Sequence, residues 1–185
     1  QGIKLTPLKR IIDEKGYHYE TVDVAFDREQ RKATITVSAP KGIEPDTSEA
    51  ITAAGVNWWP LKMARELDDA ILLLRSNELT LGTWEIKTQG GSSGILACDQ
   101  VLARFPEHWF IRETIGMIRR TFARLEVSSR TLFAIIDQGS CFAGTLLELA
   151  LAADRSYMLH LPDGDANAPY IELSPMNFGP YPTAQ

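Results

Sequence analysis

The segment over residues 139–154 constrains the fold most, because it joins a tight turn to a helix with almost no polar face. A strand-like run at 131–136 precedes it, and small residues then lead into a helix that opens near Gly144 or Thr145. A helix that is apolar nearly all round is normally buried. We therefore expect this helix to lie inside the core, next to a buried strand.

Glu148 is the one acid in this apolar helix. A buried carboxylate must be paired, hydrogen-bonded or used, because an isolated buried charge costs several kcal/mol or raises its pKa. The free N–H groups of the first helical turn also favour negative charge nearby. One interpretation is a site that stabilises an oxyanion and moves a proton. The other is structural: Glu148 is a first-turn residue favoured by the helix dipole, or it pairs with Arg155.

Hydrophobic periodicity predicts the order of the remaining elements. Thr6 and Pro7 form a helix-start signal, which places a short helix over residues 6–15. The other expected elements are a hairpin of strands at 21–26 and 33–38, a loop at 39–54, a helix that follows Trp58-Trp59-Pro60, a strand at 81–88, a helix at 107–125, and strands at 131–136, near 155–159 and at 170–173. Strands that alternate with helices after an initial hairpin indicate an α/β layered fold.

The composition of the 185-residue chain is that of one ordinary globular domain, with 44% hydrophobic and 23% charged residues. A net charge of -5 without a basic stripe argues against nucleic acid as a partner, and no apolar run has the length of a membrane span. Cys98 and Cys141 are too few for a disulfide framework, so we expect a cytoplasmic protein. The three histidines show no metal-ligand spacing. Since the chain begins without methionine, we expect it to be part of a longer protein.

A serine hydrolase is an alternative that the sequence keeps open. Residues 90–94 match the G-x-S-x-G pattern after a predicted strand, which would make Ser92 a nucleophile. A turn rich in glycine and serine matches this pattern easily by chance. A catalytic triad would also need a downstream acid and histidine, and only His108 and His160 remain. This alternative is therefore the least favoured.

Three segments of the chain carry a resemblance to a known family. Residues 134–154 resemble the second signature of the crotonase (enoyl-CoA hydratase/isomerase) superfamily, which runs from a strand through Asn-Gly and a glycine run to Glu-Leu-Ala and Asp. Residues 39–41 resemble the family's Arg-Pro-Lys turn, and residues 88–99 fit its Thr-Gly-Gly loop, with the final aspartate retained. The similarity extends over residues 19–179, to Pro-Met-Asn-Phe-Gly at its end.

The resemblance implies an α/β fold whose core is a crotonase-like spiral of ββα repeats. We expect this core over residues 19–185, after a helical lead-in at 1–18. The family's C-terminal helices, which cover the active site and build oligomers, are expected to be missing from this sequence. A homo-oligomer is therefore expected of the full-length protein.

The resemblance also assigns site residues. The backbone N–H groups of Cys98 and Thr145 would form an oxyanion hole for a thioester carbonyl. Thr145 and Leu146 replace two glycines of the family's run, so Gly144 is the alternative second donor. Glu148 aligns with one of the two glutamates that serve as acid and base in the hydratases.

The second glutamate of the family falls on Pro175, and Glu172 is its nearest replacement. Lys41 would help to hold the phosphates of coenzyme A, or it is a solvated surface lysine. The resemblance implies an enzyme that acts on a small CoA thioester without metal, flavin or oxygen. The closest similarity is to members that open an aromatic-derived ring and release formate and an aldehyde CoA thioester. A plain enoyl-CoA hydratase or isomerase and a non-catalytic scaffold, with Glu148 paired to Arg155, remain the alternatives.

Overall fold

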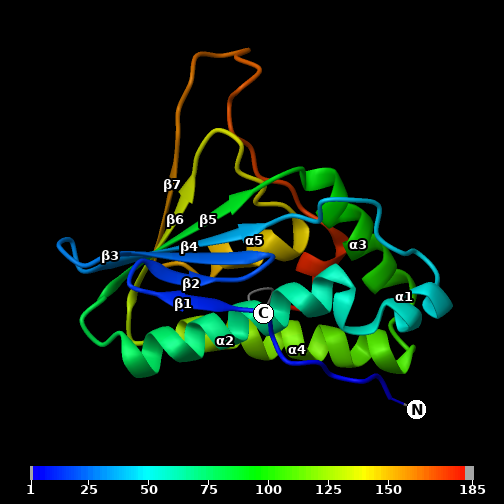
Figure 1. The fold of residues 1–185 in the computed structure, drawn as a ribbon. Coiled ribbons are helices and arrows are strands. Elements are labelled where there is room, and N and C mark those ends of the chain that lie inside the picture. Colours follow the sequence, from blue (N-terminus) through cyan, green and yellow to red (C-terminus); the bar gives the residue numbers. More distant parts are fainter. Residues whose placement is uncertain (1, 182–185) are drawn as a thin grey trace.

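A computed structural model describes residues 2–181, and they form one mixed sheet with helices between its parallel strands (Figure 1). The sheet has seven strands, whose spatial order follows the chain. The first four strands pair antiparallel: β1 (Ile11–Asp13), β2 (Gly16–His18), β3 (Val22–Asp27) and β4 (Lys32–Ser38). The last three continue the sheet in parallel from β4: β5 (Thr83–Gln89), β6 (Thr131–Ile136) and β7 (Arg155–Met158). The predicted α/β class is thereby confirmed.

Helices connect the parallel strands, as such strands require a long crossover. The elements after β4 are α1 (Ser48–Ala54), η1 (Gly55–Asn57) and α2 (Trp59–Asn77); after β5, α3 (Ser92–Arg104) and α4 (Trp109–Glu126); after β6, α5 (Gly144–Leu151); and after β7, η2 (Pro175–Asn177). The long helices α2 and α4 pack against each other below the sheet in Figure 1, whereas α3, α5 and η2 contact one another. This second group of elements builds the candidate site.

Strand β4 alternates between half-buried and buried positions, which is the period-two pattern that predicted it, and β5 alternates in the same way over most of its length. Along β4 the buried side chains are Ala33, Ile35 and Val37, and along β5 Trp84 and Ile86 take the same role. Full burial of a large apolar side chain contributes about 1.5–3 kcal/mol to stability. Only β3, β4 and α2 form a complete ββα unit within the described residues, since each later unit adds one strand to the sheet.

The predicted helix at residues 6–15 is wrong. The segment leads into β1, and a turn built on Asp13 carries the chain into β2. The Asp13 carboxylate accepts the N–H groups of Lys15 and Gly16 at 2.7 and 3.1 Å. A Cβ atom on Gly16 would lie 1.7 Å from the carbonyl oxygen of Val24, so the close pairing of β2 with β3 requires glycine there. The expected lead-in thus joins the same sheet as the core.

The predicted loop at residues 39–54 contains a helix that the periodicity missed. Thr47 caps α1, since its hydroxyl accepts the N–H of Ala50 at 3.3 Å. The segment at 170–173 does not form the strand expected there; it contributes an isolated bridge between Ala143 and Glu172. The predicted site range 88–99 is also partly helical, because α3 begins at Ser92.

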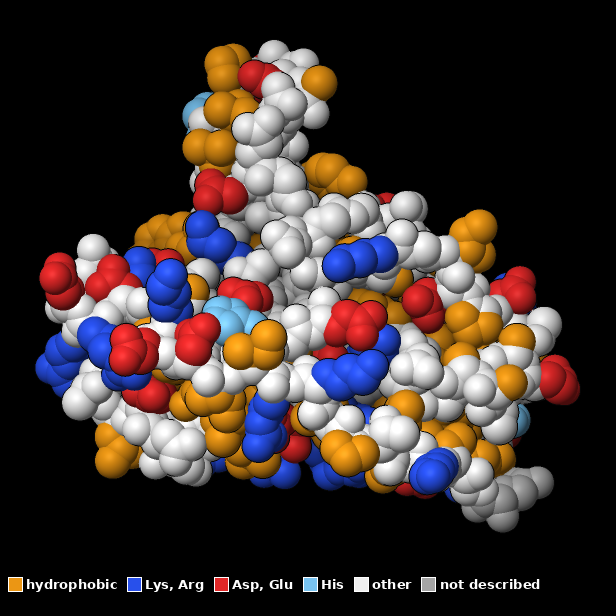
Figure 2. All heavy atoms as spheres, viewed as in Figure 1, with side chains coloured by type: hydrophobic (Ala, Val, Ile, Leu, Met, Phe, Trp, Pro, Cys, Tyr) orange, Lys and Arg blue, Asp and Glu red, His pale blue; other side chains and the backbone are white. Residues whose placement is uncertain are grey.

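The segment between β7 and η2 projects away from the sheet (Figure 1). Exposed apolar side chains occur along β7 and this projection: Tyr157, Met158, Leu159, Tyr170, Ile171 and Leu173. Figure 2 shows hydrophobic side chains on the projection at the top of the view. Within residues 2–181, no helix combines the length and apolar character needed to cross a bilayer.

Candidate active site

Gly144 starts α5 at a point where a larger residue would not fit. Its φ is +45°, and a Cβ atom would lie 2.0 Å from Oδ2 of Asp99. Its N–H donates to the carbonyl oxygen of Glu172 at 2.8 Å. Glycine is therefore needed both for the left-handed backbone and for the close approach of the Asp99 carboxylate to the helix.

The Asp99 carboxylate, fully buried on α3, is the centre of a polar cluster. It accepts the Thr145 N–H at 2.8 Å, the Ser174 hydroxyl at 2.6 Å, and the Thr145 hydroxyl. The Tyr181 hydroxyl lies 2.7 Å from the same Thr145 hydroxyl. One carboxylate thus connects α3, the N-terminus of α5 and the segment that contains η2.

Burial dominates the electrostatics of this cluster. It raises the pKa of Asp99 to about 6, against the opposing effect of the hydrogen bonds from Ser174 and Thr145, and the nearby charge of Glu148 adds to the rise. Burial also raises the pKa of Tyr181 well above its usual range. The Cys98 thiol has a raised pKa for the same reason, with smaller contributions from Glu44 and Asp99. A thiol in this environment is a poor nucleophile.

Glu148 is fully buried on α5, in agreement with the prediction from the apolar helix. Its Oε1 accepts a hydrogen bond from the side-chain amide of Asn177 at 2.7 Å. The same amide donates to the carbonyl oxygen of Gly144 at 3.0 Å. The side-chain oxygen of Asn177, Oδ1, accepts the N–H of Ser174 at 2.9 Å, within the capping box of η2. The oxygen and the nitrogen of the Asn177 side-chain amide are therefore both held by hydrogen bonds. Arg155, the alternative partner of Glu148 considered from the sequence, is exposed on β7.

The backbone N–H groups of Thr145 and Gly144, assigned to the oxyanion hole, have other hydrogen-bond partners in this structure. Cys98 lies well inside α3, where backbone N–H groups bond within the helix. The Thr145 N–H is occupied by Asp99, and the Gly144 N–H by the carbonyl oxygen of Glu172. Binding of a thioester oxygen by these groups would require the hydrogen bonds to exchange, and the oxyanion hole stays a prediction.

Glu172 enters the site through its backbone. Its N–H donates to the carbonyl oxygen of Phe142 at 3.1 Å, and its own carbonyl oxygen accepts the Gly144 N–H. Its side chain is half-buried. The structure thus assigns Glu172 a part in holding the start of α5, and its role as the second acid or base remains a prediction.

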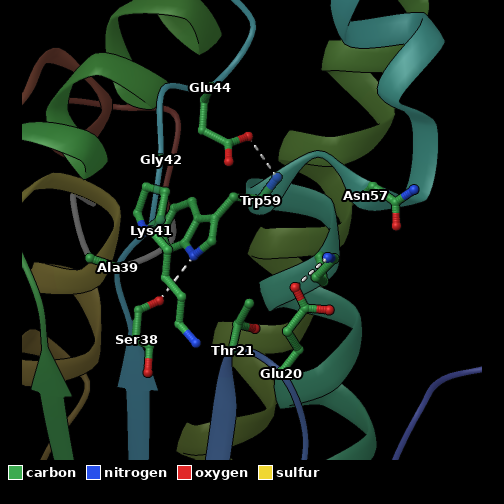
Figure 3. A pocket seen from close by; sticks show the side chains of 11 residues that line it. Glu20, Thr21, Ser38, Ala39, Lys41, Gly42, Glu44, Asn57 and Trp59 are labelled. Atoms are coloured by element: carbon green, nitrogen blue, oxygen red, sulfur yellow. Dashed lines mark hydrogen bonds and ion pairs between the residues drawn. The ribbon is translucent and has the colours of Figure 1, made fainter.

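Lys41 lies at another place, on a cavity of about 150 Å³ between the loop after β4 and the start of α2 (Figure 3). Trp59 forms a fixed wall, since its indole N–H donates to the Ser38 carbonyl oxygen at 2.9 Å and its backbone N–H to Glu44 at 3.1 Å. Lys62 also lines the cavity, 3.0 Å from the carboxylate of Glu20. The cavity therefore carries charges of both signs.

Ser92 lies at the start of α3 with its hydroxyl 2.9 Å from that of Tyr170. The phenol is a hydrogen-bonding partner of Ser92 and does not take the place of the histidine base that a catalytic triad requires. Among the described residues there is also no group of three or more His, Cys, Asp or Glu placed to hold a metal ion.

Sequence reasoning missed the residues that surround the two buried acids. Ser174 and Asn177 lie in the family-like segment and Tyr181 lies just after it, but the sequence assigned a role to none of them. The one local signal was Ser174-Pro-Met-Asn177, which has the spacing of a capping box with proline at the first helical position.

Comparisons with known proteins support the resemblance at the level of sequence. No family model matches the chain. The chain is 54% identical over 182 residues to benzoyl-CoA-dihydrodiol lyase of Aromatoleum evansii, a match that covers 98% of this chain and 32% of that protein. A solved enoyl-CoA hydratase of Bacillus halodurans is 12% identical, with a TM-score of 0.46 over 74% of this chain and 49% of that structure; a likeness of this size carries no conclusion. The chain is therefore similar to a part of benzoyl-CoA-dihydrodiol lyase and spans about one third of the length of that protein.

Proposed function

We propose that this chain belongs to an enzyme that opens an aromatic-derived ring held as a CoA thioester. The proposed substrate is 2,3-epoxybenzoyl-CoA or the corresponding dihydrodiol, and the products are formate and an aldehyde CoA thioester. The observation that carries the proposal is the fully buried Glu148, in a segment that is 54% identical to the lyase over 182 residues. Coenzyme A arrives with the substrate in this reaction, and the full-length protein is proposed to be a homo-oligomer.

Glu148 is the proposed acid/base of this reaction. Ring opening by water requires protons to move between the attacking water, the ring oxygen and the carbon that is released. A carboxyl group does this near neutral pH when its surroundings favour its protonated form, and burial has that effect. The Asn177 amide holds one carboxyl oxygen of Glu148 at 2.7 Å, which limits the directions in which the group can transfer a proton.

Lys41 is the proposed contact for the phosphates of coenzyme A. Its side chain is exposed beside the cavity that Trp59 and Lys62 also line. A lysine is a flexible point charge that suits phosphate groups arriving from solvent. Glu44 lines this cavity, and its charge contributes to the raised pKa of Cys98. Since Cys98 precedes Asp99 on α3, the cavity borders the helix that carries the buried cluster.

The test is to incubate the full-length protein with 2,3-epoxybenzoyl-CoA and to measure formate and the aldehyde product. Wild-type protein should release both in equal amounts, Glu148→Gln should release little, and the exposed control Glu126→Gln should match the wild type. Hydration of crotonyl-CoA in the absence of formate release would replace this proposal by a plain hydratase. Consumption of neither thioester would reject an enzymatic role on both substrates.

A further inference from the structure

A second cavity, of about 410 Å³, lies between the N-terminal segment and the helices α2 and α4. Figure 1 shows this segment running below α4 before it reaches β1. The volume is in the range of sites for small molecules, which is about 300–1,000 Å³. Within residues 2–181, its walls share no residue with the buried Asp99 cluster or with the cavity that Lys41 lines. The cavity is therefore a separate place on the molecule.

Most of the cavity wall is apolar. The apolar side chains that line it are Ile3, Leu5, Leu61, Trp109, Phe110 and Met117. Leu61 and Phe110 are buried, and the Phe110 ring lies 5.8 Å from the ring of the fully buried Trp58. Since the core holds these two side chains in place, that part of the wall is formed before a ligand arrives. It suits the hydrocarbon chain or ring of a ligand.

Two arginines add positive charge to this wall: Arg65 from α2 and Arg120 from α4. Neither of them forms an ion pair with another described residue. Arg65 donates one hydrogen bond to the carbonyl oxygen of Thr6 at 2.8 Å, and Arg120 has a weak contact with the sulfur of Met117 at 4.0 Å. A guanidinium group has five N–H donors, so both arginines retain donors for a ligand.

The acids that could pair with Arg65 on its own helix have other partners. Side chains three and four residues apart on a helix are neighbours, which makes Asp68 and Asp69 the expected partners of Arg65. Asp68 instead pairs with Arg124 of α4 at 2.6 Å, and Asp69 pairs with Arg10 at 2.7 Å. The positive charge of Arg65 is therefore available to a ligand in the cavity.

The charges of the wall match a ligand with one negative charge. Glu113 also lines the cavity, 3.9 Å from Arg112, so two arginines and one glutamate give the wall one net positive charge. We propose that the cavity binds a carboxylate that carries an apolar chain or ring, with the carboxylate on Arg65 and Arg120 and the apolar part against Phe110. The planar guanidinium group matches the geometry of a carboxylate. This inference concerns binding and does not depend on the proposed ring-opening reaction.

The test is isothermal titration calorimetry of the full-length protein at pH 7 with octanoate, and with 1-octanol as the uncharged match. Octanoate should bind at one saturable site per chain, and more tightly than 1-octanol. Arg65→Gln and Arg120→Gln should each weaken octanoate binding by roughly tenfold or more, because each removes a charged hydrogen-bond donor. The control Arg119→Gln, exposed on α4 and outside the cavity wall, should leave the affinity unchanged. Octanoate should also raise the melting temperature of the wild type more than that of the two cavity variants.

Equal affinities for octanoate and 1-octanol overturn the inference, as does octanoate binding that neither arginine substitution weakens. If Arg65→Gln does not fold, the exposed Arg120 decides the test alone. No saturable binding also overturns the inference, because another part of the full-length protein or a second copy then covers the cavity. A dimer that Met117→Glu dissociates would identify the second copy as the occupant. None of these measurements uses turnover, so a protein that binds octanoate but releases no formate supports this site and rejects the proposed reaction.

Discussion

Replacing Gly144 by alanine should destabilise the protein far more than a glycine-to-alanine change at an open turn. Two costs add at this position. The backbone has φ of +45°, a region where a side chain costs roughly 1–2 kcal/mol. The new methyl group would also lie 2.0 Å from Oδ2 of Asp99, so the carboxylate must move away from donors that it now accepts.

The second cost follows from the hydrogen bonds that the Asp99 carboxylate would lose on moving away. Oδ2 of Asp99 accepts the Thr145 N–H at 2.8 Å and the Ser174 hydroxyl at 2.6 Å. A hydrogen bond to a charged group contributes about 1.5–3 kcal/mol, and the expected loss is worked out for one of the two bonds. Together with backbone strain, the expected loss is roughly 3–5 kcal/mol. For a chain of this size, each kcal/mol lowers the melting temperature by about 2–4 °C.

The matched control is Gly139→Ala. Gly139 has a φ of +79°, but a Cβ atom there has nothing within 4 Å, so it carries the strain without the clash. The assay is thermal unfolding of both variants and the wild type at pH 7, followed by circular dichroism. Gly144→Ala should lose roughly 6–20 °C, and Gly139→Ala only a few degrees. Equal losses in the two variants would refute the close approach of Asp99 to the start of α5.

Four further outcomes follow from the site. Glu148→Gln should lower formate release by roughly 10²–10⁴ with little change in CoA-thioester affinity, and near-wild-type turnover would remove its acid/base role. Ser92→Ala should retain nearly full turnover, whereas a collapse with unchanged folding would favour a serine hydrolase. Glu172→Gln should reduce turnover as strongly as Glu148→Gln if Glu172 is the second acid or base, and should leave it intact if the residue acts through its backbone alone. Because the pKa of Asp99 is raised to about 6 in the folded protein, the folded protein binds this proton more tightly than the unfolded chain does. The free energy of unfolding of the wild type, relative to that of Asp99→Asn, should therefore fall by about 3 kcal/mol as the pH rises from about 4 to 6. A difference that does not depend on pH, measured by denaturant unfolding, would contradict the raised pKa.

The elements that the sequence predicts well are those whose signals are local. The four-and-three spacing of apolar residues in α4 and the alternation in β4 depend on residues within a few positions of each other. The helix expected at residues 6–15 had a local start signal as well, in Thr6 and Pro7. Pairing of β1 with β2 overrode it, since the sheet supplies backbone hydrogen bonds that a short exposed helix could not match.

The sequence predicted the burial of one residue of the candidate site but not the hydrogen bonds between its residues. An acid in an apolar helix is expected to be buried, so Glu148 could be singled out from the sequence. Its neighbours could not, because Asp99 reaches Thr145 across 46 residues and Ser174 across 75. Periodicity contains no information about which distant side chains share a hydrogen bond. The resemblance placed Cys98 and Thr145 near each other, but it did not reveal that Asp99 takes the Thr145 N–H for itself.

That occupied donor bears directly on the chemistry of the site. A thioester oxygen could bind the Thr145 N–H only by displacing Asp99, which would leave a buried charge short of one donor at a cost of about 1–3 kcal/mol. The Gly144 N–H is similarly committed to the carbonyl oxygen of Glu172. Proton transfer by Glu148 requires neither exchange, since its carboxyl group lies about one turn further along α5 and is held by Asn177. The proposed acid/base role of Glu148 is therefore compatible with the hydrogen bonds as they stand, whereas the predicted oxyanion hole requires Thr145 or Gly144 to exchange its partner when substrate binds.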